Sequence, residues 1–159
     1  MIVLSIDPGI VVTGFSIIQS NGQKSSLSAY GTIKPKSNES IPERLNYLFE
    51  EVNKLLGQFS PDVLAVEDSF YSNNVKSAMI LGQARASILL PAVQADIPIH
   101  QFAPRKVKMS VCGNGAASKE QVSYMVSKIL KLKVKPKPLD ISDAIAVGLC
   151  YINQIRFHD

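Results

Sequence analysis

A short apolar run that ends on a carboxylate opens the chain and places the strongest constraint on its fold. Ile2–Ile6 has the length and β-branched content of a buried strand, and Asp7 follows at once. Pro8 and Gly9 then stop the strand, because proline lacks an N–H and glycine tolerates a positive φ, and the run Val11–Ile18 is predicted to return beside it. An acid at the end of a core strand is well placed to hold a cation, although an ordinary turn explains the same three residues.

The same design returns in Asp62–Glu67, where a short apolar strand again ends on a carboxylate. If the two strands are neighbours, Asp7 and Glu67 converge at the edge where open α/β sheets bind ligands. Asp140 and Asp143, three residues apart, share one face of the last predicted helix. Acids in a first turn also stabilise a helix by themselves, and this is the alternative explanation for the pair.

Four carboxylates brought together in this way need bound cations or shared protons, because like charges repel. Oxygen ligands favour Mg²⁺, for which Mn²⁺ can substitute, over zinc. Two such ions about 3.5–4 Å apart activate a water and stabilise the leaving oxygen in phosphodiester cleavage. The sequence therefore predicts a two-ion site whose ligands are Asp7, Glu67, Asp140 and Asp143.

Basic residues are concentrated in one part of the chain. Residues 101–139 hold nine Lys or Arg and one acid, so this segment carries +8, whereas the rest of the chain carries −4. Such segregation indicates a polyanionic partner, and a solvated basic face is the alternative. Lysines at every second position from 131 to 137 predict an extended, exposed stretch.

Apolar periodicity and turn signals predict an α/β sandwich over a mixed sheet, with an antiparallel meander followed by parallel strands. Strands are predicted at Ile2–Ile6, Val11–Ile18, Ser26–Ile33, Asp62–Glu67 and Ile97–Phe102. Helices are predicted from Ser40 to about Leu56, ended by Gly57 and Pro61; from Asn73 or Asn74 to Leu90, ended or kinked by Pro91; and over 118–130 and 139–152, with a basic helix or turn at 105–111. Ser40 and Ser118 each begin a capping box. The 159 residues are predicted to form one domain, residues 1–159.

The composition, 46% hydrophobic and 19% charged, is typical of a soluble globular protein. No basic and apolar leader precedes the first strand, and no apolar run reaches the roughly 18 residues that a membrane span needs. Cys112 and Cys150 lack metal-ligand spacing, so reduced thiols are expected. These features predict a cytoplasmic protein with no membrane partner.

Two loops have residues suited to nucleic acid. Phe70 and Tyr71, which follow Glu67 closely, are predicted to stack on unpaired bases or, alternatively, to anchor their loop in the core. The segment GNGAASK, residues 113–119, does not match a nucleotide P-loop. Its backbone N–H groups and Lys119 nevertheless suit a phosphate, with plain helix capping as the alternative.

Small residues recur every four positions on one face of the second predicted helix, at Ala78, Gly82 and Ala86. Another backbone can approach closely along such a face. The sequence favours packing on the chain's own sheet, and a subunit interface is the alternative.

Five motifs, in order from Ile2 to about Ile152, together resemble the RuvC family of bacterial Holliday junction resolvases: DPGIVVTGF, VEDSF, LGQARA, RKVK through GNGAASKEQV, and LDISDAIAV. The resemblance implies an RNase H-like fold with a five-stranded mixed sheet. It implies a homodimer, joined through the helix that bears LGQARA, which binds a four-way DNA junction. Paired symmetric nicks made with Mg²⁺, ligatable ends and a branch-migration helicase complex as partner are also implied.

The resemblance carries roles to matching positions. The metal-binding acids match Asp7, Glu67, Asp140 and Asp143, and the basic residues near the scissile phosphate match Lys108 and Lys119, the latter placed among the catalytic residues. The residues expected to contact DNA are Phe70, Tyr71, Lys76, Arg105, Lys108, Lys119, Lys131 and Lys133.

Three residues depart from the family's pattern: Val12 where an arginine is common, Phe15 where a tyrosine is frequent, and Asp68 where an uncharged residue is usual. The first two remove polar groups near Asp7. The extra carboxylate of Asp68 either perturbs the site or serves as a ligand.

The predicted function is that of a structure-selective DNA endonuclease, which resolves Holliday junctions during recombination and repair. A non-catalytic four-way-junction-binding protein is the alternative, although binding to phosphates alone disfavours carboxylates at the contact surface. An actin-like or sugar-kinase phosphotransferase shares the strand-Asp-x-Gly pattern, but such proteins need two domains of this kind around the nucleotide.

Overall fold

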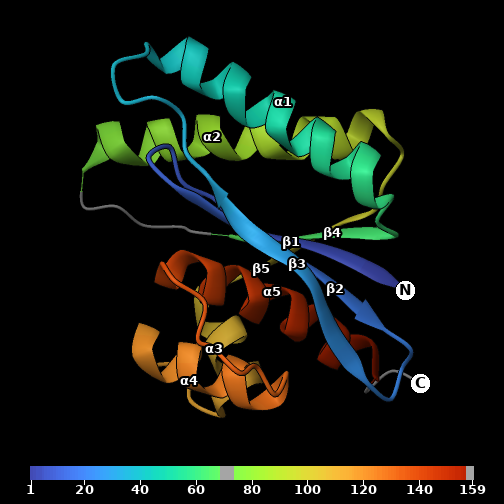
Figure 1. The fold of residues 1–159 in the computed structure, drawn as a ribbon. Helices are drawn as coiled ribbons and strands as arrows, with labels where there is room; N and C mark the ends of the chain where they lie inside the picture. The colour runs from blue at the N-terminus through green and yellow to red at the C-terminus, as the bar shows by residue number, and fades with distance from the viewer. Residues whose placement is uncertain (69–73, 157–159) are drawn as a thin grey trace.

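The computed structural model describes residues 1–68 and 74–156, which form a five-stranded sheet between two layers of helices (Figure 1). The strands are β1 (Ile2–Asp7), β2 (Thr13–Ser20), β3 (Ser25–Ile33), β4 (Val63–Glu67) and β5 (Ile99–Phe102). The helices are α1 (Ile41–Phe59), α2 (Val75–Gln94), α3 (Pro104–Cys112), α4 (Lys119–Ile129) and α5 (Leu139–Arg156). The predicted α/β class is confirmed.

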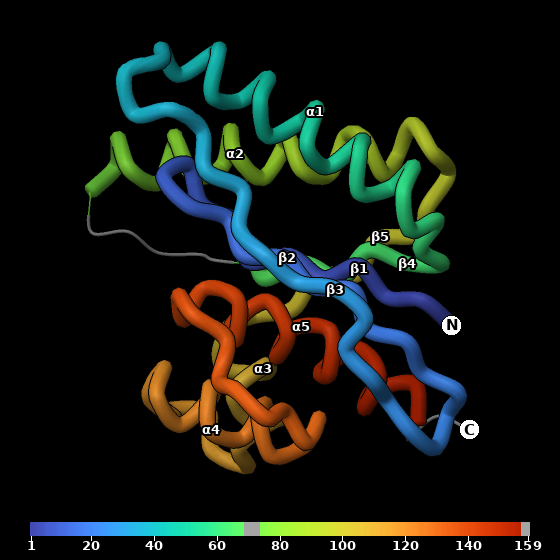
Figure 2. Tube along the Cα trace, in the orientation of Figure 1, coloured from blue at the N-terminus to red at the C-terminus, as the bar shows by residue number. Residues whose placement is uncertain are grey.

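The strands follow the order β3-β2-β1-β4-β5, so β1 lies at the centre of the sheet. β1, β2 and β3 pair antiparallel, whereas β4 pairs parallel to β1 and β5 parallel to β4. This is the predicted mixed sheet, a meander followed by parallel strands. Because β1 and β4 run the same way, their carboxyl ends meet at one edge, near the start of α5 and opposite the N-terminus (Figures 1 and 2).

Alternating side chains of the central strands build a core on each face of the sheet. Leu4 and Ile6 of β1 are fully buried against α1 and α2, whereas Val3 packs into the cluster formed with α3, α4 and α5. α5 lies very close to the sheet, since a Cβ on its Gly148 would stand 2.7 Å from the hydroxyl oxygen of Ser5. Burying both faces of β1 fixes its register and therefore the position of Asp7.

The predicted helix starts are confirmed. Ser40 and Ser118 each form a capping box, and the side chain of Asn74 accepts hydrogen bonds from the first backbone N–H groups of α2. Two details of the helix ends are corrected. Gly57 does not end α1, which stops before Pro61, where Ser60 adopts a left-handed φ of 45°. Pro91 does not end α2, which continues to Gln94.

Three further expectations are corrected. Gly9 has no positive φ, and the reason for glycine is the close carbonyl oxygen of Val12, 2.2 Å from where a Cβ would stand. The lysine-rich segment 131–137 is a series of turns and bends rather than an extended stretch, and it begins with Lys131 at a φ of 52°. The small-residue face of α2, Ala78, Gly82 and Ala86, is exposed, so the favoured packing on the chain's own sheet is wrong.

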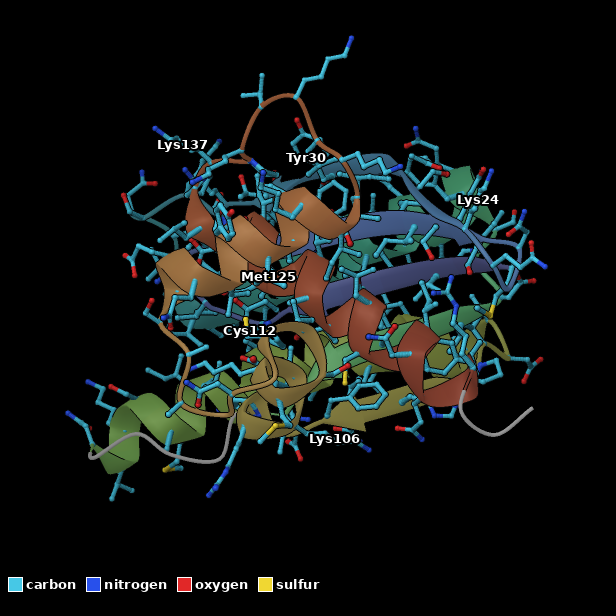
Figure 3. The ribbon with its side chains drawn as sticks, turned by 90° about the horizontal axis from the view of Figure 1, so that it is seen from below. Lys24, Tyr30, Lys106, Cys112, Met125 and Lys137 are labelled. Atoms are coloured by element: carbon cyan, nitrogen blue, oxygen red, sulfur yellow. The ribbon has the colours of Figure 1, made fainter. Side chains whose placement is uncertain are left out.

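The layer formed by α3, α4 and α5 carries most of the basic segment, residues 101–139 (Figure 3). Lys106 and Lys137 lie at opposite edges of this layer, so its positive charge is spread over the face. Cys112 and Met125 line a hollow of about 470 Å³ between α3 and α4, and both cysteines of the chain are free thiols. Among the described residues, no helix is long and apolar enough to cross a membrane.

Candidate active site

The register of the central strands brings Asp7 and Glu67 together. Ile6 of β1 pairs with Val66 of β4, so the next residue on each strand is an acid at the carboxyl end. The two carboxyl groups share a hydrogen bond. Burial, the charges of Glu67 and Asp143, and this hydrogen bond raise the pKa of Asp7 to about 9. The Asp7–Glu67 pair therefore holds a proton at neutral pH when no cation is present.

The position of α5 beside these acids depends on Gly14. Gly14 of β2 pairs directly with Asp7, and a Cβ at this position would stand 2.1 Å from the carbonyl oxygen of Asp140. The absent side chain therefore lets the first turn of α5 lie against the sheet. Asp140 and Asp143 reach the edge because of this close approach.

Lys119 completes the cluster from the first turn of α4. Its Nζ lies 3.1 Å from Oδ2 of Asp143, whose side chain is 14% exposed. Burial raises the pKa of Asp143, and the hydrogen bond and charge of Lys119 lower it in part. Burial lowers the pKa of Lys119, but the hydrogen bond and charge of Asp143, together with the charges of Asp7 and Asp140, raise it above its ordinary value. Lys119 is therefore positively charged, and it interacts electrostatically with Asp7, Asp140 and Asp143.

The donor groups at this edge are all carboxylate oxygens, which hard divalent cations prefer. Across residues 1–68 and 74–156, no three Asp, Glu, His or Cys side chains are arranged to hold one ion among themselves. The Asp7–Glu67 pair still fits Mg²⁺, because this ion commonly takes one or two carboxylates and completes its shell with water and phosphate oxygens. A cation held by these residues would replace the proton that the pair shares.

The remaining predicted residues take different positions. Phe70 and Tyr71 lie outside the described residues. Lys108, on α3, is half-buried and close enough to lower the pKa of Asp143. Exposed positions at the surface are occupied by Lys76, Arg105, Lys131 and Lys133.

The sequence reasoning missed residues that hold the site in place. The backbone N–H of Gly9 donates to the hydroxyl of buried Thr13, which donates in turn to the carbonyl of Gly9, at 3.0 and 2.6 Å. Arg44 of α1 donates to the carbonyl of Ile10 over 2.8 Å. Asp68 pairs with Arg85 of α2 at 2.6 Å, so it faces an arginine. The sequence signal for Arg85 was its place in the LGQARA motif.

The family model for crossover junction endodeoxyribonuclease RuvC matches residues 3–151. Relatives with that description come from Dictyoglomus thermophilum, 43% identical over 152 residues, and from Natranaerobius thermophilus, 42% identical over 156 residues. The matches cover 96% and 98% of this chain, and 96% and 97% of the relatives.

The fold is similar to that of a solved structure, RuvC of Thermus thermophilus in complex with Holliday junction substrate. The TM-score is 0.93 at 33% identity, with 99% of this chain and 96% of the other covered. This likeness confirms the RNase H-like fold. By its sequence and its fold, the chain belongs to the RuvC family of crossover junction endodeoxyribonucleases.

Proposed function

We propose that this protein is a metal-dependent endonuclease that resolves Holliday junctions by paired symmetric cuts in DNA. The observation that carries the proposal is the buried carboxylate cluster at the ends of β1 and β4, with Lys119 beside it, in a chain of this family. A buried acid with a pKa of about 9 is typical of a site made for a cation or a proton.

Asp7 and Glu67 would hold the first Mg²⁺ or Mn²⁺, and Asp140 and Asp143 would help to hold a second. The bound ions supply an activated water and stabilise the leaving oxygen. Lys119 neutralises Asp143 and offers the exposed part of its side chain, 60% exposed, to an approaching phosphate. The hydrogen bonds between Gly9 and Thr13 hold the loop after Asp7 in a compact turn. The backbone of this loop therefore does not block the approach of a phosphate to Asp7.

Junction DNA would lie over basic residues of α2, α3, α4 and the segment 131–137. The proposed phosphate contacts are Lys76, Arg105, Lys108, Lys119, Lys131 and Lys133. Phe70 and Tyr71, in the segment that follows Glu67, are proposed to stack on bases at the crossover. Charge of one sign distributed over a face gives affinity that depends on salt and not on sequence.

Paired cuts need two active sites related by a two-fold axis, and α2 offers the surface for a homodimer. Large apolar side chains are exposed along it: Val75, Met79, Leu90 and Val93, at 76%, 64%, 52% and 59%. The exposed small residues between them allow a second helix to pack closely. A branch-migration helicase complex is the proposed further partner.

The test of the proposal is Asp7→Asn on a synthetic four-way junction with Mg²⁺. We expect binding to be kept, because the substitution removes negative charge from the phosphate-facing surface, and cleavage to be lost. Lys24→Gln, on the β2–β3 turn, is the control and should leave both unchanged. Cleavage by Asp7→Asn at the wild-type rate would contradict the metal site. Binding without cleavage by the wild-type protein would favour the non-catalytic alternative.

A further inference from the structure

Arg85 of α2 joins the ends of two neighbouring strands. Its NH1 group lies 2.6 Å from Oδ1 of Asp68, which directly follows β4, and its NH2 group donates to Oε1 of Gln101 in β5. The side chains of Arg85 and Asp68 are each only 18% exposed. The two arms of one guanidinium therefore connect β4, β5 and α2. We call these three residues the Arg85 clamp.

The clamp begins one residue after Glu67. The backbone N–H of Asp68 donates to the carbonyl of Phe102 over 2.8 Å, which continues the pairing of Glu67 with Phe102. Asp68 is thus held by both its backbone and its side chain. Because Glu67 is the last residue of β4, its position depends on how firmly the neighbouring Asp68 is held.

The clamp also gives the extra carboxylate, that of Asp68, a charged partner. The side chain of Asp68 is only 18% exposed, and a mostly buried carboxylate needs a charged partner. NH1 of Arg85 neutralises it while NH2 reaches Gln101, an arrangement of two partners that a lysine cannot reproduce. Arg85 is also on the helix that bears the exposed apolar face, so the position of α2 is linked to the end of β4.

We infer that the Arg85 clamp is a positioning device for the metal-binding carboxylate Glu67. Asp68 and Arg85 touch neither metal nor DNA; they fix the end of β4 on α2 and so hold Glu67 ready to bind the ion. The inference rests on the proposed function, because it takes Glu67 as a metal ligand. It excludes Asp68 itself as a ligand.

The experiment compares the affinity for Mg²⁺ and Mn²⁺, measured by titration calorimetry, and the unfolding temperature of each variant. Asp68→Asn removes the charge and keeps the shape. Arg85→Gln keeps the carboxylate of Asp68 and removes its partner on α2. Lys54→Gln, which breaks the exposed pair with Glu51, is the matched control.

We expect Asp68→Asn to weaken metal binding by roughly 10- to 100-fold, the usual effect of removing a group that orients a ligand. Arg85→Gln should weaken metal binding by a similar factor, because Asp68 then loses the contact that fixes the end of β4 on α2. Lys54→Gln should change nothing. If Asp68→Asn does not fold, Arg85→Lys serves in its place, with a roughly tenfold loss expected from the missing second arm.

Three outcomes would overturn the inference. Wild-type metal affinity in Asp68→Asn, with only a lower unfolding temperature, would make the clamp purely structural. Weaker metal binding in Asp68→Asn but not in Arg85→Gln would indicate that Asp68 ligates the ion itself. A wild-type protein that binds neither ion and cuts no junction would overturn the proposed function together with the clamp, whereas the first two results leave the proposed function intact.

Discussion

Replacing Gly14 by alanine is the perturbation whose effect follows most directly from the structure. The added methyl group would stand 2.1 Å from the carbonyl oxygen of Asp140 and 2.5 Å from its carbonyl carbon. Both neighbours are backbone atoms, so no side-chain rotation relieves the contact. The first turn of α5 must therefore move away from β2.

Real Cβ atoms essentially never come within 3.0 Å of such neighbours, so α5 must shift by about 1 Å. The shift carries Asp140 and Asp143 away from Asp7 and changes the contact of Asp143 with Lys119. A misplacement of about 1 Å costs catalysis on the order of 100-fold. Overpacking of this kind costs about 1–3 kcal/mol in the free energy of unfolding, which lowers the unfolding temperature by several degrees.

The assay is the single-turnover rate of junction cleavage, measured beside urea unfolding. Gly57→Ala is the matched control, since a Cβ at Gly57 in α1 meets no atom within 4 Å. This control should cut normally and be more stable by roughly 0.5–1 kcal/mol, because alanine favours a helix interior. If Gly14→Ala cuts at the wild-type rate, the close approach of α5 does not position the acids and the reasoning fails.

Three other predictions concern charge and assembly. Because the pKa of Asp7 is about 9 in the folded protein and 3.8 is its ordinary value, folding takes up a proton between these limits. The free energy of unfolding without metal should therefore fall as the pH rises from about 4 to 9, and urea titrations should find most of this slope absent in Asp7→Asn. Replacing Lys131 and Lys133 by glutamine should weaken junction binding and reduce the slope against log salt by up to about one unit per lost contact, whereas Lys24→Gln, on the β2–β3 turn, should leave the slope unchanged. Met79→Asp, on the exposed face of α2, should shift sedimentation from dimer to monomer; a dimer unaffected by this charge would rule out that face.

Strand patterns were enough to predict that Asp7 and Glu67 meet at one edge of the sheet. Each of the segments 2–7 and 62–67 is a short apolar run that ends on an acid. Because the two strands pair in parallel, the two acids meet at the same edge of the sheet. Capping boxes at Ser40 and Ser118 fixed two helix starts, because the interactions that form them lie within four residues. Local patterns of this kind can be read directly from the chain.

Contacts between distant segments could not be predicted in the same way. The need for glycine at position 14 comes from a carbonyl 126 residues away, and the partner of Asp68 is an arginine on another element. The exposed face of α2 was assigned to the chain's own sheet because small residues suit either kind of packing. Only the three-dimensional arrangement distinguishes the two.

Product mapping on a four-way junction shows directly whether the protein makes paired, metal-dependent cuts. Each strand is labelled at its 5′ end in turn, and the wild-type protein is incubated with the junction in Mg²⁺ or in EDTA. We expect cuts at symmetric positions in one pair of opposed strands, in Mg²⁺ only. We also expect products that DNA ligase reseals. Cleavage that persists in EDTA, unpaired cuts at scattered positions, or binding with no cleavage in Mg²⁺ would contradict the proposed function.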